Sequence, residues 1–394
     1  MDKATIRDID IKGKKVLVRV DFNVPLDEQG NITDDTRIRA ALPTIQYLIE
    51  QDCRIILMSH LGRPKGERNA KYSMTPVAER LSDILQKEVK QAKDCISEET
   101  KQMAKELQSG EILLLENTRF YPGETKNDSE LAKELASMGE VFVNDAFGAA
   151  HRAHSSTVGV TDYIPAVAGF LLEKELAILT EVLEKPDRPF TAIIGGAKVS
   201  DKIMVLKNLA TKVDNLIIGG GMANTFLKAR GMNMADSLVE EDKMELAKAI
   251  EEEAKACGVN LLLPVDLVIA EEISEDAHIQ IVRGEVPAGY KALDIGSSSA
   301  IAFAQIIKNS ALVLWNGPMG VFEIDKFARG TEVIARAVAE CPGKAIVGGG
   351  DSVAAIEKVG VADAIYHIST GGGASLEFLE GKMLPGVAAL QDKN

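Results

Sequence analysis

Three segments in the second half of the chain share one pattern, in which a short apolar run ends in glycines and a helical pattern follows. The copies are TAIIGGAKVSDKI (191–203), NLIIGGGMANTFLK (215–228) and KAIVGGGDSVAAIEK (344–358), and LVLWNGPMG (312–320) is a looser fourth. Short branched-aliphatic runs bounded by glycine are typical of buried parallel strands. Glycine at the turn into a helix lets backbone N–H groups approach an anion, and the positive end of the helix favours phosphate. One such turn is equally explained as an ordinary tight loop, but several along one sheet edge predict a polyphosphate site.

The composition excludes several classes of protein. A chain of 394 residues can form two domains, and 46% hydrophobic with 26% charged residues is typical of a soluble globular protein. The formal net charge of −14 argues against nonspecific nucleic-acid binding, so a site for anionic substrates must be a local concentration of cations. The four cysteines lie far apart, which indicates free thiols in a reducing compartment. Neither a signal peptide nor an apolar stretch of membrane-spanning length is visible. We expect a cytoplasmic protein with no membrane or nucleic-acid partner.

Strand and helix patterns alternate in the first half of the chain. Strands are expected at 14–21, 53–59, 111–117 and 140–145, with helices at 36–51, 75–87 and 128–138 between them. Asp128 is suited to cap the last of these helices, and Thr75 and Pro76 are suited to the N-cap and first helical positions of the second. Strands separated by helices imply a parallel sheet that is covered on both faces.

A long helical pattern over 166–184 is followed by a break at KPDRPF (185–190), after which a second α/β series begins. Helices at 240–256, 299–309 and 331–340 and strands near 260–263, 311–315 and 363–367 complete that series. We therefore predict an α/β protein of two doubly wound, Rossmann-like parallel-sheet domains that face each other across a cleft. The predicted parts are residues 1–170, a connecting helix and linker at 171–189, and residues 190–375.

Cationic and imidazole side chains follow the strands of the first half. They are Arg37, Arg39, His60, Arg63, Arg119, His151, Arg152 and His154. Arginine matches phosphate and carboxylate oxygens in a bidentate manner, and a doubly wound sheet gathers its strand-end loops into one crevice. The HRAH motif (151–154) has no third ligand at a suitable spacing, which argues against a metal site. Asp21 and Asn23 follow the first strand and fit either substrate binding and orientation of the arginines or, for Asp21, a simple turn cap.

Nine motifs spread over the chain resemble those of the phosphoglycerate kinase family. They are RVDFNVP, SHLGRPKG, ENTRFYPGE, NDAFGAAHRAHSS, GGAKVSDKI, LIIGGGMA, WNGPMGVFE, VGGGDS and STGGGASLEFLEGK. The resemblance implies a two-domain, usually monomeric kinase. It implies reversible transfer of a phosphoryl group from 1,3-bisphosphoglycerate to MgADP, which gives 3-phosphoglycerate and ATP. It also implies that a tail at about 376–394 returns to pack on the first domain.

The same resemblance assigns site residues. For phosphoglycerate they are Asp21, Phe22, Asn23, Arg37, His60, Leu61, Gly62, Arg63, Arg119 and Arg152. For the nucleotide they are Gly195, Lys198, Lys202, Gly219, Gly220, Asn316, Glu323, Gly349, Gly350, Asp351 and Ser352. Arg37, Lys198 and Lys202 are the expected catalytic residues, and Asp351 is the expected Mg²⁺ ligand. The chain departs from the family at Ser352, where threonine is frequent, and at GSSSA (296–300), which lacks the usual proline-containing loop.

Acyl-phosphate chemistry agrees with the residue types present. Neither a carboxylate nor a diphosphate oxygen must lose a proton to attack, so the reaction needs positioning and cations but no general base. Lys202, four residues after Lys198, is expected on the same face of a helix that begins after GGAK. Two separated sites require a hinge, which we expect at the ends of the 166–184 helix and near 369–375. A further phosphate loop is the alternative explanation of Gly371–Gly373.

Two other functions were weighed against the kinase. An NAD-dependent oxidoreductase would also use glycine turns after strands, but the chain contains no G-x-G-x-x-G motif and no ribose-binding acid at the usual interval. A P-loop motif is likewise absent from the sequence. A binding protein without turnover is disfavoured because Arg37, Lys198, Lys202 and Asp351 are all present.

Overall fold

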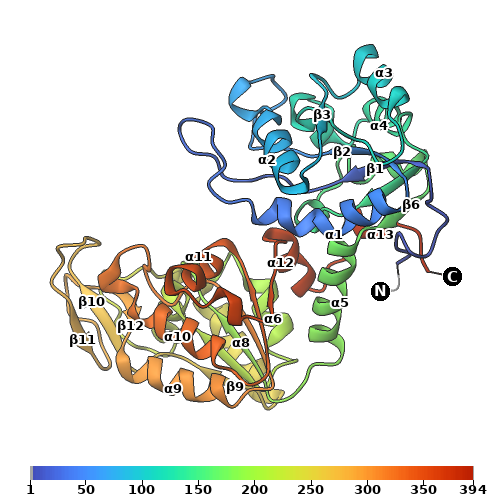
Figure 1. Ribbon diagram of the computed structural model, residues 1–394. Coiled ribbons are helices and arrows are strands. Elements are labelled where there is room, and N and C mark those ends of the chain that lie inside the picture. The colour runs from blue at the N-terminus through green and yellow to red at the C-terminus, as the bar shows by residue number, and fades with distance from the viewer. Residues whose placement is uncertain (1–2, 394) are drawn as a thin grey trace. The chain divides into compact units, whose positions relative to one another are not determined.

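The computed structural model describes residues 3–393, and its internal contacts divide the chain into two compact units (Figure 1). The N-terminal unit runs up to Ile178 and also includes the chain from Met383 onward, whereas the C-terminal unit is Leu179–Lys382. The division falls inside helix α5, Phe170–Glu184. Residues 1–2 of the expected first domain and residue 394 of the expected tail lie outside the described residues.

The N-terminal unit contains one six-stranded sheet in the order β3-β4-β2-β1-β5-β6, and every neighbouring pair is parallel. The strands are β1 Lys15–Arg19, β2 Arg54–Met58, β3 Val89–Gln91, β4 Ile112–Leu114, β5 Val141–Asn144 and β6 Ala166–Ala168. The helices are α1 Thr36–Glu50, α2 Thr75–Leu85, α3 Glu98–Glu106, α4 Ser129–Ala136, the start of α5, and α13 Pro385–Ala388. The doubly wound parallel sheet predicted for the first half is confirmed.

The C-terminal unit repeats this plan with a six-stranded parallel sheet in the order β15-β14-β13-β7-β8-β9. Its strands are β7 Phe190–Ile194, β8 Asn215–Ile218, β9 Asn260–Leu262, β13 Leu312–Asn316, β14 Lys344–Gly348 and β15 His367–Ile368. Its helices are α6 Ile203–Leu209, α7 Gly220–Ala229, α8 Met244–Ala256, α9 Ser297–Lys308, α10 Arg329–Ala339, α11 Gly350–Val359 and α12 Gly373–Leu379. The second parallel sheet is therefore also confirmed.

A smaller antiparallel sheet was not predicted. It has the order β11-β10-β12 and consists of β10 Leu267–Ala270, β11 Gln280–Val282 and β12 Lys291–Ile295. Figure 1 shows it at the left-hand end of the C-terminal unit. Its strands are short and follow acidic, polar segments, so they give little periodic signal.

Two local predictions need correction. The 166–184 pattern is not one helix, because Ala166–Ala168 pairs with β5 and α5 begins only at Phe170. A three-residue apolar run cannot be distinguished from a buried helix turn by periodicity alone. The strand expected at 363–367 is mostly a 3₁₀ turn at Ala362–Ala364, and only His367 and Ile368 form β15.

Other local predictions are confirmed or shifted by one position. Asp128 caps α4, since its Oδ1 accepts a hydrogen bond of 2.9 Å from the Leu131 N–H. Helix α2 begins at Thr75 with Met74 at the N-cap, so Thr75 is one position inside the helix and Pro76 lies in the first turn. Helix α1 buries Ile38, Ala41, Thr44, Ile45 and Leu48, the spacing of an amphipathic helix on a sheet.

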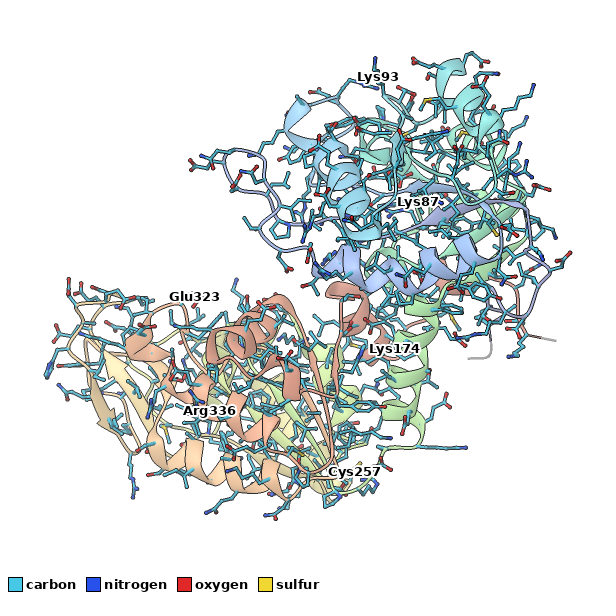
Figure 2. The ribbon with its side chains drawn as sticks, viewed as in Figure 1. Lys87, Lys93, Lys174, Cys257, Glu323 and Arg336 are labelled. Atoms are coloured by element: carbon cyan, nitrogen blue, oxygen red, sulfur yellow. The ribbon has the colours of Figure 1, made fainter. Side chains whose placement is uncertain are left out.

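All four cysteines are free, and Cys257 lies exposed at the end of α8 (Figure 2). Among the described helices, none combines the length and apolar character that crossing a bilayer requires.

The end of the chain packs into the N-terminal unit. The Gly386 N–H donates to the Ala150 carbonyl at 2.8 Å, and the Asn144 side chain donates to the Gly386 carbonyl at 3.1 Å. Leu384, Val387 and Leu390 are buried there, with at most 3% of their surface exposed. The last residues therefore complete the core of the unit in which the chain begins.

This packing predicts that Leu384→Ala lowers the free energy of unfolding of the N-terminal unit by about 2–5 kcal/mol, because a fully buried leucine leaves a cavity. The neighbouring Met383 is 58% exposed, so Met383→Ala is the matched control and should change that free energy by less than about 0.5 kcal/mol. Urea denaturation followed by circular dichroism would measure both. Equal effects of the two substitutions would contradict the buried role of the tail.

Candidate functional site

The four glycine loops lie in one row at the carboxyl edge of the C-terminal sheet. Strands β14, β13, β7 and β8 are consecutive in that sheet. Asn316 at the end of β13 is in register with Gly348 of β14 and with Ile194 of β7, and Ile194 is in register with Ile218 of β8. The predicted clustering of glycine turns at one sheet edge is thus confirmed.

These loops approach one another backbone to backbone. A Cβ atom on Gly195 would lie 2.1 Å from the Pro318 carbonyl oxygen, and one on Gly220 would lie 2.5 Å from that of Gly196. A Cβ on Gly219 would lie 2.4 Å from the Met319 sulfur. A side chain at Gly195 or Gly220 would push the backbones of the loops apart, whereas one at Gly219 would displace the Met319 side chain. Gly350 differs, because it faces open space at the start of α11.

Lys202 joins the loops that follow β7 and β13. Its Nζ donates to the carbonyls of Gly195 and Asn316 at 2.8 and 3.1 Å and to the Asn316 side-chain oxygen at 2.6 Å. Burial lowers the pKa of Lys202 to about 8, although the charges of Asp351 and Asp201 oppose this shift.

The predicted helical relation between Lys198 and Lys202 is wrong. Helix α6 begins only at Ile203, and Lys202 is its N-cap residue. Residues 195–202 instead form a loop, and the Lys202 side chain at its end bonds back to the Gly195 carbonyl at its start. Lys198 is exposed and forms no hydrogen bond or ion pair with any residue between 3 and 393.

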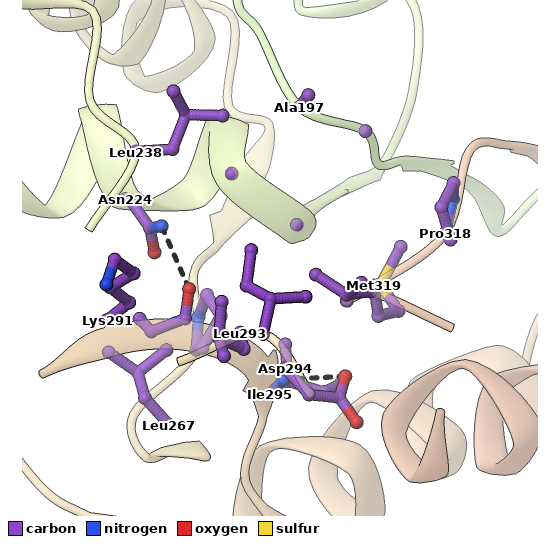
Figure 3. A pocket seen from close by; sticks show the side chains of 18 of the residues that line it. Ala197, Asn224, Leu238, Leu267, Lys291, Leu293, Asp294, Ile295, Pro318 and Met319 are labelled. Atoms are coloured by element: carbon purple, nitrogen blue, oxygen red, sulfur yellow. Dashed lines mark hydrogen bonds between the residues drawn. The ribbon is translucent and has the colours of Figure 1, made fainter. Parts of the chain in front are cut away.

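A pocket of about 480 Å³ adjoins the glycine loops. Of the predicted nucleotide residues, Gly220, Glu323 and Asp351 line it directly. Its other walls are largely apolar, and Figure 3 shows Leu238, Leu293 and Met319 around the space. Glu323 lies on the surface of the C-terminal unit (Figure 2). The pocket therefore combines a largely apolar surface with glycine backbone and the acidic side chains of Glu323 and Asp351.

Sequence reasoning missed the apolar wall and one buried acid. Asp294 lies in this wall with 3% exposure, and it accepts hydrogen bonds from the Gly330 and Ile295 N–H groups at 2.7 and 2.8 Å. Burial raises the pKa of Asp294 to about 7. Leu238 and Leu293 come from a loop and from β12, and isolated leucines in such segments carry no signal of a binding role.

Two predicted nucleotide residues act inside the loops. Ser352 is fully buried, and its Oγ accepts a hydrogen bond of 2.6 Å from the Gly317 N–H. Asn316 is 3% exposed and accepts from Lys202. Both side chains therefore set the shape of the turn after β13. Gly349, at the N-cap of α11, has a φ of 87°, a conformation that glycine adopts without strain.

The GSSSA segment (296–300) forms the N-cap and first turn of helix α9. Asp266 caps this helix, accepting from the Ser298 and Ser299 N–H groups at 2.9 and 2.8 Å and from the Ser299 hydroxyl at 2.5 Å. Ile295, which lines the pocket, is two residues before Ser297, where α9 begins. The hydrogen bonds between Asp266 and these serines thus hold the start of α9, next to one end of the pocket wall.

The N-terminal unit gathers its cations around the loops after β1, β2 and β4. Arg37 Nη1 donates to Asp21 Oδ2 at 2.6 Å, and Asp21 Oδ1 also accepts from the Asn23 N–H at 3.3 Å. Asp21 therefore both orients an arginine and caps a turn, which unites the two interpretations of this residue. Asn23 Oδ1 accepts from the Gly62 N–H at 2.8 Å, and Arg119 Nη1 donates to the Gly62 carbonyl at 3.0 Å.

The remaining predicted phosphoglycerate residues divide by exposure. Arg63 and Arg152 are exposed, and within the described part of the chain their side chains have no ion-pair partner. Phe22 and Leu61 are fully buried, so neither residue presents surface to a ligand. Arg39 points to a different partner, since its Nε donates to Asp35 at 2.9 Å.

No group of three or more metal-ligating side chains occurs between residues 3 and 393. Sequence reasoning also missed Arg19, Glu124 and Ser156, which are fully buried beneath the cationic cluster. Burial lowers the pKa of His154 beside them to about 4, and neighbouring arginines contribute to the shift. Charged residues inside strands and loops give no pattern that would separate them from surface charges.

Comparisons with known proteins agree with this arrangement. The family model described as phosphoglycerate kinase matches residues 6–382. The phosphoglycerate kinase structure from Coxiella burnetii is 43% identical, covers 98% of both chains and superimposes with a TM-score of 0.89. That from Pyrococcus horikoshii OT3 is 34% identical, also covers 98% of both chains and gives a TM-score of 0.85. A match of this extent shows that the chain belongs to the phosphoglycerate kinase family.

Proposed function

We propose that this protein is a phosphoglycerate kinase that transfers a phosphoryl group reversibly from 1,3-bisphosphoglycerate to ADP. The observation that carries the proposal is the row of four glycine loops beside an apolar pocket, in a chain whose other unit holds a cluster of arginines. The family match supports the same substrates.

In the C-terminal unit we assign the base of the nucleotide to the apolar pocket and its phosphates to the glycine loops. Helices α7 and α11 begin directly at these loops, so their first N–H groups and their dipoles favour a polyphosphate. Lys198 is the exposed cation available to the transferring group. Lys202 adds charge from behind the loops, and with a pKa of about 8 it is mostly protonated at neutral pH.

Mg²⁺ fits this site as a partner of the nucleotide. Asp351 is the acidic residue in the first turn of α11 and lines the pocket. A single carboxylate with phosphate oxygens and water is a common ligand set for Mg²⁺, which is seldom held by protein groups alone. When bound, the ion would neutralise charge on the phosphates.

In the N-terminal unit we assign the three-carbon acid to the arginine cluster. Arg63, Arg119 and Arg152 can pair with its phosphate or carboxylate, while Asp21 and Asn23 can accept hydrogen bonds from its hydroxyl. Asp21 holds Arg37 in a defined direction, which is the requirement for a cation that meets the phosphoryl group during transfer. The attacking oxygen carries no proton, so these residues need only position and neutralise.

Direct in-line transfer requires that both ligands come together, and we propose that the two units close over them. The segments that would bend are the ends of α5 and the glycines near 371–373, where Gly372 has a φ of 51°. Asp145 caps the start of α5, because its Oδ1 accepts a hydrogen bond from the Leu171 N–H at 2.8 Å.

We further propose that the enzyme works as a monomer in the cytoplasm, and its four free thiols support the reducing compartment.

The first test is a coupled assay of the purified protein with 3-phosphoglycerate and MgATP. We expect release of ADP that depends on 3-phosphoglycerate, and we expect chelation of Mg²⁺ with EDTA to abolish it. Failure to make ADP with correctly folded protein, or to make ATP from 1,3-bisphosphoglycerate and ADP, would refute the proposed function.

Arg37→Ala should lower kcat by about 10²–10³-fold without loss of folding, since it removes one cation from the transition state. Arg39→Ala is the matched control, because Arg39 lies on the same helix but pairs with Asp35. Its kcat should stay within about twofold of the unmodified enzyme. Similar kcat values for the two variants would contradict the proposed role of Arg37 in phosphoryl transfer.

Closure predicts a smaller radius of gyration when both substrates are bound. Small-angle X-ray scattering should show the decrease with 3-phosphoglycerate and a non-hydrolysable MgATP analogue together, and a lesser one with either alone. An unchanged radius in an assay-competent preparation would contradict closure and leave the substrate assignment intact.

A further inference from the structure

Arg19 lies directly beneath the cationic cluster, at the last position of β1, with none of its surface exposed. Its side chain makes three hydrogen bonds that point in different directions. Nε donates to Ser156 Oγ at 2.8 Å, Nη1 donates to the Val20 carbonyl, and Nη2 lies 3.0 Å from His60 Nδ1. The planar guanidinium is therefore held at every nitrogen, and its position relative to the His60 ring is fixed.

The contact with His60 determines where the imidazole proton sits. A guanidinium has only donors and is not deprotonated in proteins, so Nη2 must donate and His60 Nδ1 must accept. A protonated Nδ1 would place two N–H groups against each other. The ring is then neutral with its proton on Nε2, and Nε2 has no hydrogen-bond partner among residues 3–393.

A buried carboxylate keeps Arg19 in place. Glu124 is fully buried, accepts from the Ser156 hydroxyl at 2.5 Å and from the Ser156 N–H at 3.1 Å, and balances the arginine charge. The hydrogen bonds therefore run from the Glu124 carboxylate to the Ser156 hydroxyl, from there to the Arg19 guanidinium, and from Arg19 to the His60 imidazole. Each group has a defined donor or acceptor role. Moving the imidazole proton from Nε2 to Nδ1 would therefore break the hydrogen bond between Arg19 and His60.

The surroundings of His60 also disfavour its charged form. Burial lowers the pKa of His60 well below its usual range, and the charges of Arg19, Arg119, Arg37 and His154 lower it further. His154 lies 3.9 Å from Glu124, and its own pKa of about 4 leaves it neutral near pH 7. Among residues 3–393, no carboxylate forms an ion pair with the His60 ring.

We propose that Arg19 is a positioning residue that holds His60 as the neutral Nε2–H tautomer, so that His60 offers one fixed, uncharged donor to an anionic oxygen of the substrate. The identity of that substrate as phosphoglycerate rests on the function proposed above. The surrounding arginines already supply charge. A neutral His60 instead orients a substrate oxygen through one directional hydrogen bond. Its ability to donate that bond does not change between about pH 6 and 8, where a free imidazole titrates.

The direct test is ¹⁵N NMR of the unmodified protein with labelled histidine. The chain has five histidines, and a His60→Asn variant identifies the His60 signals by their disappearance. We expect an unprotonated Nδ1 and a protonated Nε2 that stay unchanged from about pH 8 to pH 5.5. A protonated Nδ1, or a titration of His60 in this range, would overturn the proposal.

Enzyme kinetics separate positioning from structural support. In Arg19→Met the His60 Nδ1 loses its donor, so both tautomers become populated and KM for 3-phosphoglycerate should rise about tenfold, with KM for ATP unchanged. Because Glu124 would then be buried without a partner, the double variant Arg19→Met with Glu124→Gln removes the leftover charge. We expect it to recover stability but not the KM or the tautomer. Recovery of a normal KM in the double variant would reduce Arg19 to a charge-balancing role.

The tests distinguish this inference from the proposed function. A protein that lacks kinase activity but shows the Nε2–H tautomer contradicts only the function. An active kinase in which His60 carries its proton on Nδ1 contradicts only the role of Arg19. Since the NMR measurement uses the unmodified protein, it decides the question even if the Arg19 variants do not fold.

Discussion

The shape of the proposed nucleotide site depends on the close approach of the loops after β7 and β13. Lys202 holds that approach with an ammonium group that donates to Gly195 and to both oxygens of Asn316. Two backbone carbonyls pointed toward each other would repel, and a buried cation between them turns that repulsion into attraction. The glycines make the approach sterically possible, and Lys202 makes it electrostatically favourable. Removing either would displace the loops after β7 and β13.

In each unit, one cationic side chain bonds to the loops beneath the proposed ligand site. In the N-terminal unit this cation is the fully buried Arg19, at the end of the central strand β1. In the C-terminal unit it is the partly buried Lys202, in the loop that follows the central strand β7. Each binds oxygen atoms of neighbouring loops, and each lies beneath groups proposed to meet a ligand. Burial lowers the pKa of both side chains. Arginine stays charged despite this shift, which suits a fixed hydrogen-bond donor, whereas Lys202, with a pKa of about 8, is charged near pH 7 and loses its charge only at higher pH.

The sequence predicted what depends on short-range pattern and missed what depends on tertiary packing. Glycines after apolar runs located the ends of β7, β8 and β14, and parallel pairing then required those ends to meet. The helix expected between Lys198 and Lys202 failed because a helical pattern cannot show that a lysine will fold back onto strand-end carbonyls. The buried Arg19–Ser156–Glu124 contacts were missed for the same reason, because Arg19 lies far from Ser156 and Glu124 in the sequence and these residue types are equally common on surfaces. The antiparallel β10–β12 sheet and β6 were missed because their strands are too short to give a periodic signal.

The two proposed ligands would account for the contrast between the glycine loops of one unit and the arginine cluster of the other. A polyphosphate attached to a base presents many equivalent oxygens, which rows of backbone N–H groups can match once glycine removes the side chains. A small acid with one phosphate and one carboxylate offers fewer oxygens, so directional forks such as those of Arg63 and Arg119 discriminate better. Concentrating these cations in one cluster of a chain with net charge −14 also creates a local positive field in a negative background. That field draws anionic substrates to the cluster while the rest of the surface repels them.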